Sequence, residues 1–358
     1  MHRHLLSVPA TILVLTCTLV AQGAQGNATS ASSPAIATLL DAARTHDLLS
    51  LTDPHGNNAV QAFLLSLIRD SRFPDSINDI VIEPASSRYQ DVLDRFVRGD
   101  DVDIAVLRKV WEEHTVPNSL GVQAEEMIRT VRAVNASLPT AKKLRVIAGD
   151  PPIDWDNVAT PQDARRWIEL RDSYPADIVR RQVLDRGRRG LIVYGQGHLM
   201  RKQIATNYDM SAWQSQTLVS YLERDHHARI FNVWTLIDRD MEVAESLKGA
   251  TVPTLITLRG TSLGASDFAS FAPRLDRQNR IRLKDGRLEP VPPDQWSKMP
   301  FEDEFDALLY LGPPASMTTN SVPASLCGDA DFVRRRIERL QRFGPPPEVE
   351  NFKKACGL

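Results

Sequence analysis

The hydrophobic pattern of the chain alternates short apolar runs with longer segments of helical spacing. Runs such as Ile80-Val81-Ile82 are too short for helices and rich in β-branched residues, which predicts buried strands. Between these runs, apolar residues recur every three or four positions, as from Asn57 to Arg69, which predicts amphipathic helices. Strands that alternate with helices are typical of α/β proteins with a mostly parallel central sheet flanked by helices. The predicted strands cover residues 47–52, 80–83, 143–149, 191–194, 229–237, 252–258 and 306–311. The predicted helices cover residues 35–45, 57–69, 86–99, 102–114, 122–138, 160–186 with an interruption at Pro175, 211–224 and 330–343.

The start of the chain has the pattern of a secretory signal. Residues 5–21 are mostly apolar, follow a short basic segment, and precede small and polar residues around Gly23. This pattern predicts a signal peptide over residues 1–23 and a flexible leader over residues 24–35. The apolar stretch is short for a membrane span, so we expect no stable span after cleavage and a secreted or periplasmic protein.

The remaining chain predicts one α/β domain over residues 36–343, with a loop-rich insertion at about 260–304 and a C-terminal tail over 344–358. Removal of the signal would leave Cys327 and Cys356 of the three cysteines. An even pair in an oxidising compartment predicts a disulfide.

Composition narrows the class of partner. The formal net charge is -2, and no long basic block is present. Nucleic-acid binding rests on clustered Lys and Arg that neutralise phosphates, so this class of partner is excluded. We expect a small-molecule or peptide substrate, and the sequence does not predict an oligomeric state.

Polar side chains follow three of the predicted strands where each strand ends. Asp53 and His55 follow one apolar run, Glu83 ends a second, and the run Gly195-Gln196-Gly197-His198 follows a third. The carboxyl ends of parallel strands share one edge, where sites of α/β proteins form. Asp53 and His55 lie two positions apart and would point the same way on an extended strand end. The alternative is that Asp53 only caps backbone donors of the following turn.

Two imidazoles and one or two carboxylates at one edge suit two kinds of chemistry. They could bind a divalent metal ion, or they could act as a general-base pair for hydrolysis. The sequence has no Gly-x-Ser-x-Gly elbow, no His-Glu-x-x-His motif and no phosphate-binding glycine loop. A serine esterase of the common type is therefore not expected.

The strand-end motifs taken together resemble a known superfamily. They read Asp-Pro-His-Gly-Asn at 53–57, Val-Ile-Glu at 81–83 followed by Ser-Arg-Tyr-Gln-Asp at 87–91, Gly-Asp-Pro-Pro-Ile-Asp-Trp at 149–155, and Gly-Gln-Gly-His-Leu at 195–199. This set resembles the erythromycin esterase-like and ChaN-like superfamily, which is similar in turn to the TraB and Tiki hydrolases. The likeness extends from about Leu48 to Leu199. Residues 308–314 match the closing strand of secreted bacterial members of unassigned role.

The resemblance implies a set of site residues. His55 and His198 would be the pocket imidazoles, Glu83 the pocket carboxylate and Arg171 a helix-borne cation. With Asp53 these residues are the predicted catalytic set, and a metal ion, if bound, would take His55, Glu83 and His198 as ligands. The predicted substrate-binding residues are Asp150, Arg88 and Tyr174. The chain departs from the family where Thr52-Asp53 replaces Gly-Glu and where Tyr174-Pro175 replaces residues that would continue the helix of Arg171.

Three functions follow as hypotheses. The first is a hydrolase of an ester or amide, in which Asp53 or Glu83 activates water and Arg171 stabilises the oxyanion. The second is a protein that binds haem or another small molecule, as ChaN-like relatives imply, with His or Tyr bound to iron. The third is a catalytically degenerate member, which the departures at Asp53 and Tyr174 favour.

Overall fold

The computed structural model describes residues 33–115, 121–201, 216–235, 247–268, 281–284, 287–290, 298–313, 317–319, 321–344 and 347–358. The predicted signal peptide and all but the end of the predicted leader lie outside these residues. Residues 33–358 form one compact unit by their internal contacts. In the described part of the chain, no helix combines the length and apolarity that crossing a membrane requires.

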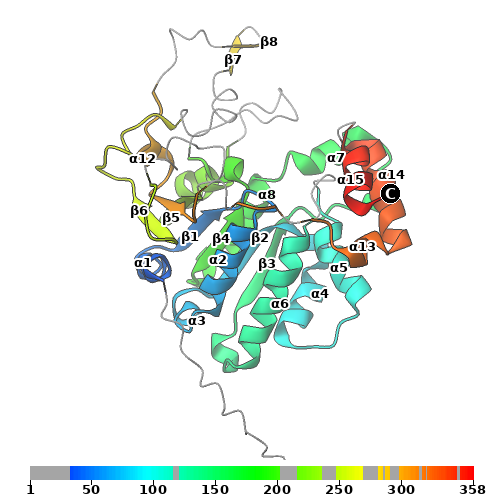
Figure 1. Ribbon diagram of the computed structural model, residues 1–358, viewed down its shortest axis with the longest axis horizontal. Helices are drawn as coiled ribbons and strands as arrows, with labels where there is room; N and C mark the ends of the chain where they lie inside the picture. The colour runs from blue at the N-terminus through cyan, green and yellow to red at the C-terminus, as the bar shows by residue number, and fades with distance from the viewer. Residues whose placement is uncertain are drawn as a thin grey trace, which may run out of the picture. The chain divides into compact units, whose positions relative to one another are not determined.

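The centre of the fold is a seven-stranded sheet with the order β3-β2-β4-β1-β5-β9-β6 (Figure 1). All neighbouring strands are parallel except β6, which runs antiparallel to β9 at the edge. The α/β prediction is therefore confirmed. The strands are β1 (Leu48–Thr52), β2 (Asp79–Ser86), β3 (Arg145–Asp150), β4 (Gly190–Tyr194), β5 (Ile230–Thr235), β6 (Thr254–Thr257) and β9 (Ala307–Tyr310). In a separate two-stranded sheet, β7 (Ile281–Lys284) pairs antiparallel with β8 (Arg287–Pro290).

Helices cover both faces of the sheet (Figure 1). They are α1 (Pro34–Ala42), α2 (Asn58–Arg69), α3 (Phe73–Ser76), α4 (Gln90–Arg98), α5 (Ile104–Glu112), α6 (Val122–Ala136), α7 (Pro161–Ile168), α8 (Ser173–Gln182), α9 (Leu218–Ser220), α12 (Phe301–Glu304), α13 (Ala324–Cys327), α14 (Ala330–Phe343) and α15 (Glu348–Cys356). Short turns of other helix types are η1 (Ser87–Tyr89), η2 (Thr140–Lys142), η3 (Trp155–Asn157), η4 (Leu184–Arg186), η5 (Gln196–Leu199) and the π-helix η7 (Tyr221–Asp225).

Alternation along the strands sorts their side chains between two cores. Leu49 and Leu51 of β1 lie in the cluster that packs under α2, α4, α5 and α6. Leu48 of the same strand lies in the other cluster, with Ile178 and Val179 of α8. Successive residues of a strand point to opposite faces, so a strand that is apolar throughout is buried on both sides. This double burial explains why the strands read as continuous apolar runs.

Helix ends follow the local sequence. The side chain of Asn57 accepts hydrogen bonds from the amides of Ala59 and Val60 and caps α2. Gly99, with φ of 116°, ends α4 in the left-handed region that glycine adopts most easily.

Two expectations about helices were wrong. Residues 160–186 do not form one helix, because α7 ends at Ile168 and α8 begins at Ser173. Pro175 does not cause this break, since it lies in the first turn of α8, where proline is tolerated. The segment 344–358, predicted as a tail, contains α15. Residues 211–215 of the predicted helix 211–224 lie outside the described residues, and the described remainder is α9 followed by η7.

A disulfide joins the last helices. Cys327 at the end of α13 is bonded to Cys356 at the end of α15, as predicted. Between them, Phe332 and Phe352 pack edge to face at 6.2 Å between ring centroids. The C-terminal segment is thus held by a covalent bond and by a small apolar cluster of its own.

Candidate active site

The carboxyl ends of β3, β2, β4 and β1 meet at one edge of the sheet. Glu83 belongs to β2, Gly195 follows β4, and Asp53 follows β1. Because β4 lies between β2 and β1, the backbones of β2 and β1 are about 10 Å apart, which is two strand spacings. Side chains from β1 and β2 can therefore meet above β4.

Asp53 and His55 form a carboxylate–imidazole pair at the end of β1. The Asp53 amide donates to the Tyr194 carbonyl at 2.7 Å, which continues the pairing of β1 with β4. His55 then adopts a φ of 22°, a left-handed conformation that is uncommon for a non-glycine residue. Its Nδ1 lies 3.1 Å from Asp53 Oδ2. The helix-capping alternative for Asp53 is not what the structure shows, since Asn57 caps α2.

Glu83 lies at the centre of the cluster. The pairing of β2 with β3 shifts between Ile82 and Ser86, and Pro84, which has no amide to donate, lies inside this irregularity. One Glu83 oxygen, Oε2, accepts a 2.5 Å hydrogen bond from the Gly195 amide and lies 3.5 Å from His55 Nε2. The other oxygen, Oε1, lies 3.5 Å from His198 Nε2. This carboxylate, with 6% of its side chain exposed, thus contacts both imidazoles.

Gly195 is required by the side chains above it. A methyl group added there would lie 3.0 Å from Glu83 Oε2 and 3.2 Å from His55 Nε2. Both contacts are closer than ordinary van der Waals distance. The absence of a side chain at residue 195 therefore lets the carboxylate and the imidazole meet over the end of β4.

His198, in η5, is held on its other side by Asp172. The Nδ1 atom of His198 lies 2.7 Å from Asp172 Oδ1. The same oxygen accepts a 2.8 Å hydrogen bond from the amide of Leu218 at the start of α9. The imidazole therefore lies between two carboxylates, Asp172 at Nδ1 and Glu83 at Nε2.

Arg171 joins this cluster to the end of β3. It lies in the turn between α7 and α8, so the expectation that a helix carries it was wrong. Its guanidinium contacts Glu83 Oε1, and its Nε lies 3.9 Å from Asp150 Oδ1. Asp150 in turn accepts hydrogen bonds from the amide and the hydroxyl of Thr115, both at 2.7 Å. Asp150 thus supports Arg171 from behind.

The charges of the cluster are mutually stabilising. Partial burial opposes ionisation of His55, but the carboxylates of Glu83 and Asp53 outweigh this effect and hold the pKa of His55 well above 6.5. Burial likewise disfavours the charged form of His198, whose pKa Asp172 and Glu83 nevertheless raise. For Glu83, burial is outweighed by His55, His198 and Arg171, which hold its pKa well below 4.5. Burial raises the pKa of Asp150 to about 7, against the opposing effects of Arg171 and the Thr115 hydrogen bonds.

Tyr194, the last residue of β4, brings a hydroxyl beneath the cluster. Its ring lies edge-on to that of His198, with 5.8 Å between centroids. Its buried hydroxyl has no hydrogen-bond partner among the described residues. A methyl group added at Gly149 would lie 1.9 Å from this hydroxyl, so only glycine fits opposite it. Burial, with the nearby Glu83 and Asp150 carboxylates, holds the pKa of Tyr194 well above 10.

Two predicted substrate-binding residues have their described contacts elsewhere. Arg88 forms an ion pair with Asp154 at 2.8 Å. The Tyr174 hydroxyl is 2.8 Å from the hydroxyl of Ser87. The structure therefore brings together Asp53, His55, Glu83, Arg171 and His198, with Asp150 behind them, and the roles of all eight residues stay predictions.

Sequence reasoning missed Asp172, the partner of His198. Its signal was its place directly after Arg171, in a stretch that resembles the interior of one long helix. Thr115, which fixes Asp150, gave no signal because it follows the predicted helix 102–114.

The predicted metal and haem sites can be compared with this donor set. In the described part of the chain, no three or more His, Cys, Asp or Glu side chains are arranged to hold a metal ion. The Nε2 atom of His55 lies beside Glu83 Oε2, whereas that of His198 lies beside Glu83 Oε1. The Arg171 guanidinium also contacts Oε1. Both nitrogens of each ring face carboxylates. As arranged, these side chains fit neither a divalent metal ion nor a haem iron.

Comparison with known proteins gives neighbours in structure. No family model matches the sequence, and no curated protein matches it either. A Bacillus cereus protein aligns with a TM-score of 0.49 and 10% identity over 76% of this chain and 90% of its own. A mutant of the erythromycin esterase EreC in its open conformation aligns with a TM-score of 0.48 and 10% identity over 80% and 94%. ChaN of Campylobacter jejuni, which binds haem cofacially, has a TM-score of 0.36 and 13% identity over 56% and 84%.

Both groups that the motifs resemble are among these neighbours. The resemblance to this superfamily stays a prediction, because the TM-scores of these alignments are all below 0.5. With identities of 10–13%, these alignments assign no activity to this chain, so any activity has to be argued from its own side chains.

Proposed function

We propose that the protein is a hydrolase of ester or amide bonds in which His55 is the general base. The observation that carries this proposal is the position of the His55 ring, which has Asp53 on Nδ1 and Glu83 beside Nε2. Its side chain is 46% exposed, whereas those of Glu83 and His198 are 6% and 18% exposed. Of these three groups, His55 is the one that solvent and substrate reach most easily.

The reaction uses neutral His55. Asp53 accepts the hydrogen bond of Nδ1–H, which leaves the lone pair on Nε2. A water molecule attacks the carbonyl carbon through its oxygen and transfers one proton to Nε2. The tetrahedral intermediate then expels the alcohol or amine, which takes that proton from Nε2. The base is thus regenerated, and one ester or amide bond is broken for each water consumed.

The remaining residues hold this base in place. When His55 is neutral, Arg171 and His198 still favour the ionised form of Glu83, whose Oε2 lies 3.5 Å from His55 Nε2. Arg171 is engaged by Glu83 and Asp150, so we assign it to positioning these carboxylates rather than to the oxyanion. Asp172 plays the same part for His198.

The proposal makes a testable statement about pH. The carboxylates hold the pKa of His55 well above 6.5, so the ring is protonated at low pH and cannot accept a proton. Hydrolysis of chromogenic esters and amides should therefore rise with pH through a midpoint above 6.5. His55→Asn should lower kcat/KM by roughly 10²–10⁴. Asn tolerates the positive φ of residue 55, so folding should be retained.

A matched control exists at His227. This exposed histidine also has a positive φ, 53°, and follows the η7 turn. His227→Asn should leave the activity unchanged. Equal activity of His55→Asn and the wild type would refute the role of His55. Lack of turnover on every ester and amide by a folded protein would favour a degenerate member instead.

We also propose that the protein is exported. The Cys327–Cys356 disulfide supports this proposal, because structural disulfides persist in oxidising compartments. Mass spectrometry of protein from the periplasm or medium should find a chain that begins near residue 24. An intact residue 1 there would contradict cleavage.

A further inference from the structure

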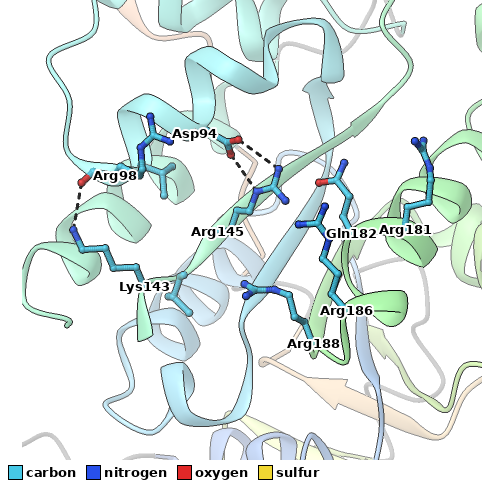
Figure 2. Close-up of a pocket in the computed structure, with 10 residues that line it drawn as sticks. Asp94, Arg98, Lys143, Arg145, Arg181, Gln182, Arg186 and Arg188 are labelled. Carbon is cyan, nitrogen blue, oxygen red and sulfur yellow. Dashed lines mark hydrogen bonds and ion pairs between the residues drawn. The ribbon is translucent and has the colours of Figure 1, made fainter. Parts of the chain in front are cut away.

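A cavity lies at the opposite edge of the sheet from the candidate active site. It surrounds the amino ends of the strands, since Arg145 begins β3 and Arg188 precedes β4, whereas Asp150 and Gly195 lie at the other ends of these strands. The cavity has a volume of about 640 Å³, in the range of small-molecule sites. Ten residues line it: Asp94, Val97, Arg98, Lys143, Leu144, Arg145, Arg181, Gln182, Arg186 and Arg188 (Figure 2).

The lining is strongly cationic. It contains six Lys and Arg side chains and a single carboxylate, Asp94. The whole chain carries a formal net charge of -2, so this concentration does not reflect a general excess of basic residues. Figure 2 shows the side chains of Arg145, Gln182 and Arg186 directed toward the same space.

The one lining carboxylate is already engaged. Asp94 accepts hydrogen bonds from Arg145 at 3.3 and 3.4 Å, and from the amide nitrogen of Gln90 at 2.8 Å. Arg188 is bound to the buried Asp79, with contacts of 2.6 and 2.8 Å. These pairs keep the two guanidinium groups fixed and leave no lining carboxylate for the other cations.

Among the described residues, Lys143 and Arg186 have no acidic partner. By contrast, Arg98 pairs weakly with Asp100, and Arg181 pairs with the exposed Asp177. Lys143 donates only to the carbonyl of Arg98, at 3.4 Å, among the contacts of the described residues. No carboxylate of the described chain pairs with Lys143 or with Arg186. An anion in the cavity would give Lys143 and Arg186 the charged partner that the described part of the chain does not supply.

Helix ends explain only part of this cluster. Arg98 and Arg181 lie in the last turns of α4 and α8, where the helix dipole favours cations. Lys143 and Arg145 come from the start of β3 and its preceding turn, and Arg188 from the segment before β4. The cationic side chains therefore come from several separate elements and line one cavity, as the residues of a binding site do.

We propose that this cavity binds a small polyanion that carries two or more negative charges on phosphate or carboxylate groups. Guanidinium groups match the planar pairs of oxygens in both, and an ammonium such as that of Lys143 adds a point charge. This site is separate from the hydrolytic cluster and does not depend on the proposed activity.

Isothermal titration calorimetry of the full chain at low ionic strength tests the proposal. Inorganic pyrophosphate and citrate are the probes, one for each chemistry. One of them should bind the wild type, and added NaCl should weaken the binding. Preference for pyrophosphate assigns the site to phosphoryl ligands, and preference for citrate assigns it to polycarboxylates.

Substitutions locate the binding. Arg186→Gln and Lys143→Gln should each weaken it by about tenfold, the loss expected for one charged hydrogen bond. Arg334→Gln is the control, because it removes the same charge from an exposed position on α14. Circular dichroism should show that all three variants fold. No binding of either probe to the wild type, or equal binding by wild type and both cavity variants, would overturn the proposal.

Discussion

Gly195→Ala is a sharp test of how the cluster works, because it changes side-chain spacing without straining the backbone. Residue 195 has φ of -55° and ψ of 147°, which any L residue adopts. The added methyl group would lie 3.0 Å from Glu83 Oε2, while ordinary contact begins at 3.4 Å, so the carboxylate must withdraw by about 0.4 Å. His55 Nε2, at 3.2 Å, must yield by about half as much.

The expected effect on activity exceeds the effect on stability. A displacement of about 1 Å at a reacting group can cost roughly a hundredfold in rate, so a shift of about 0.2 Å at His55 should lower kcat/KM about two- to threefold. Crowding of the folded state costs about 1 kcal/mol, and alanine in place of glycine restores about 0.4–1 kcal/mol by restricting the unfolded chain. The two effects nearly cancel, so the melting temperature should change by only a few degrees.

The assay combines kcat/KM on the best chromogenic ester, thermal denaturation and an NMR titration of the histidine rings. Withdrawal of Glu83 removes part of the field that raises the pKa of His55, so this pKa should fall in the variant. Gly328→Ala is the control, since a methyl group there would meet the Ala324 carbonyl at an ordinary 3.4 Å. Unchanged activity and an unchanged His55 titration in Gly195→Ala would refute the reasoning.

Three further predictions concern single features. Asp172→Asn should lower the pKa of His198, visible by NMR, and reduce kcat/KM tenfold or more, because the ring loses its Nδ1 carboxylate; an unchanged titration would contradict this. Burial raises the folded-state pKa of Asp150 from 3.8 to about 7, so the folded state binds the proton more tightly than the unfolded state. The free energy of unfolding should therefore fall as pH rises through this range, by at most about 4 kcal/mol. Urea denaturation at several pH values should show a smaller loss in Asp150→Asn, and equal losses would count against the raised pKa. Reduction of the Cys327–Cys356 disulfide, which spans 29 positions, should cost roughly 3–4 kcal/mol in the same assay, and no change would mean that the bond does not stabilise the fold.

The strand ends were predictable because each strand and the polar residue at its end are adjacent in the sequence. An apolar run that stops at Asp53, Glu83 or Gly195 identifies both the strand and the side chain at its carboxyl end, and a parallel sheet gathers such ends at one edge. The disulfide was predictable because the predicted removal of a signal peptide would leave only two cysteines to pair.

Other features depend on long-range contacts that no local pattern encodes. The break before Ser173 lies in residues with helical spacing, so Arg171 was placed on a helix and Asp172 was not recognised. The strand order and the antiparallel edge strand β6 depend on which runs pair across the sheet. The turn conformation of His55 depends on its contacts with Asp53 and Glu83, not on its neighbours in sequence alone.

The position of β4 in the sheet has a consequence for how the chain reaches its native state. β1 and β2 are not neighbours, because β4 lies between them and pairs Leu48 and Asp79 with the same residue, Gly190. Until residues 190–194 are available, the first two strands have no shared partner and the central ladder cannot close. Such pairing between distant segments slows folding, since a large loop must be ordered before any contact compensates for it. Slow folding would suit the export proposed above, because the chain would stay unfolded for longer after its synthesis.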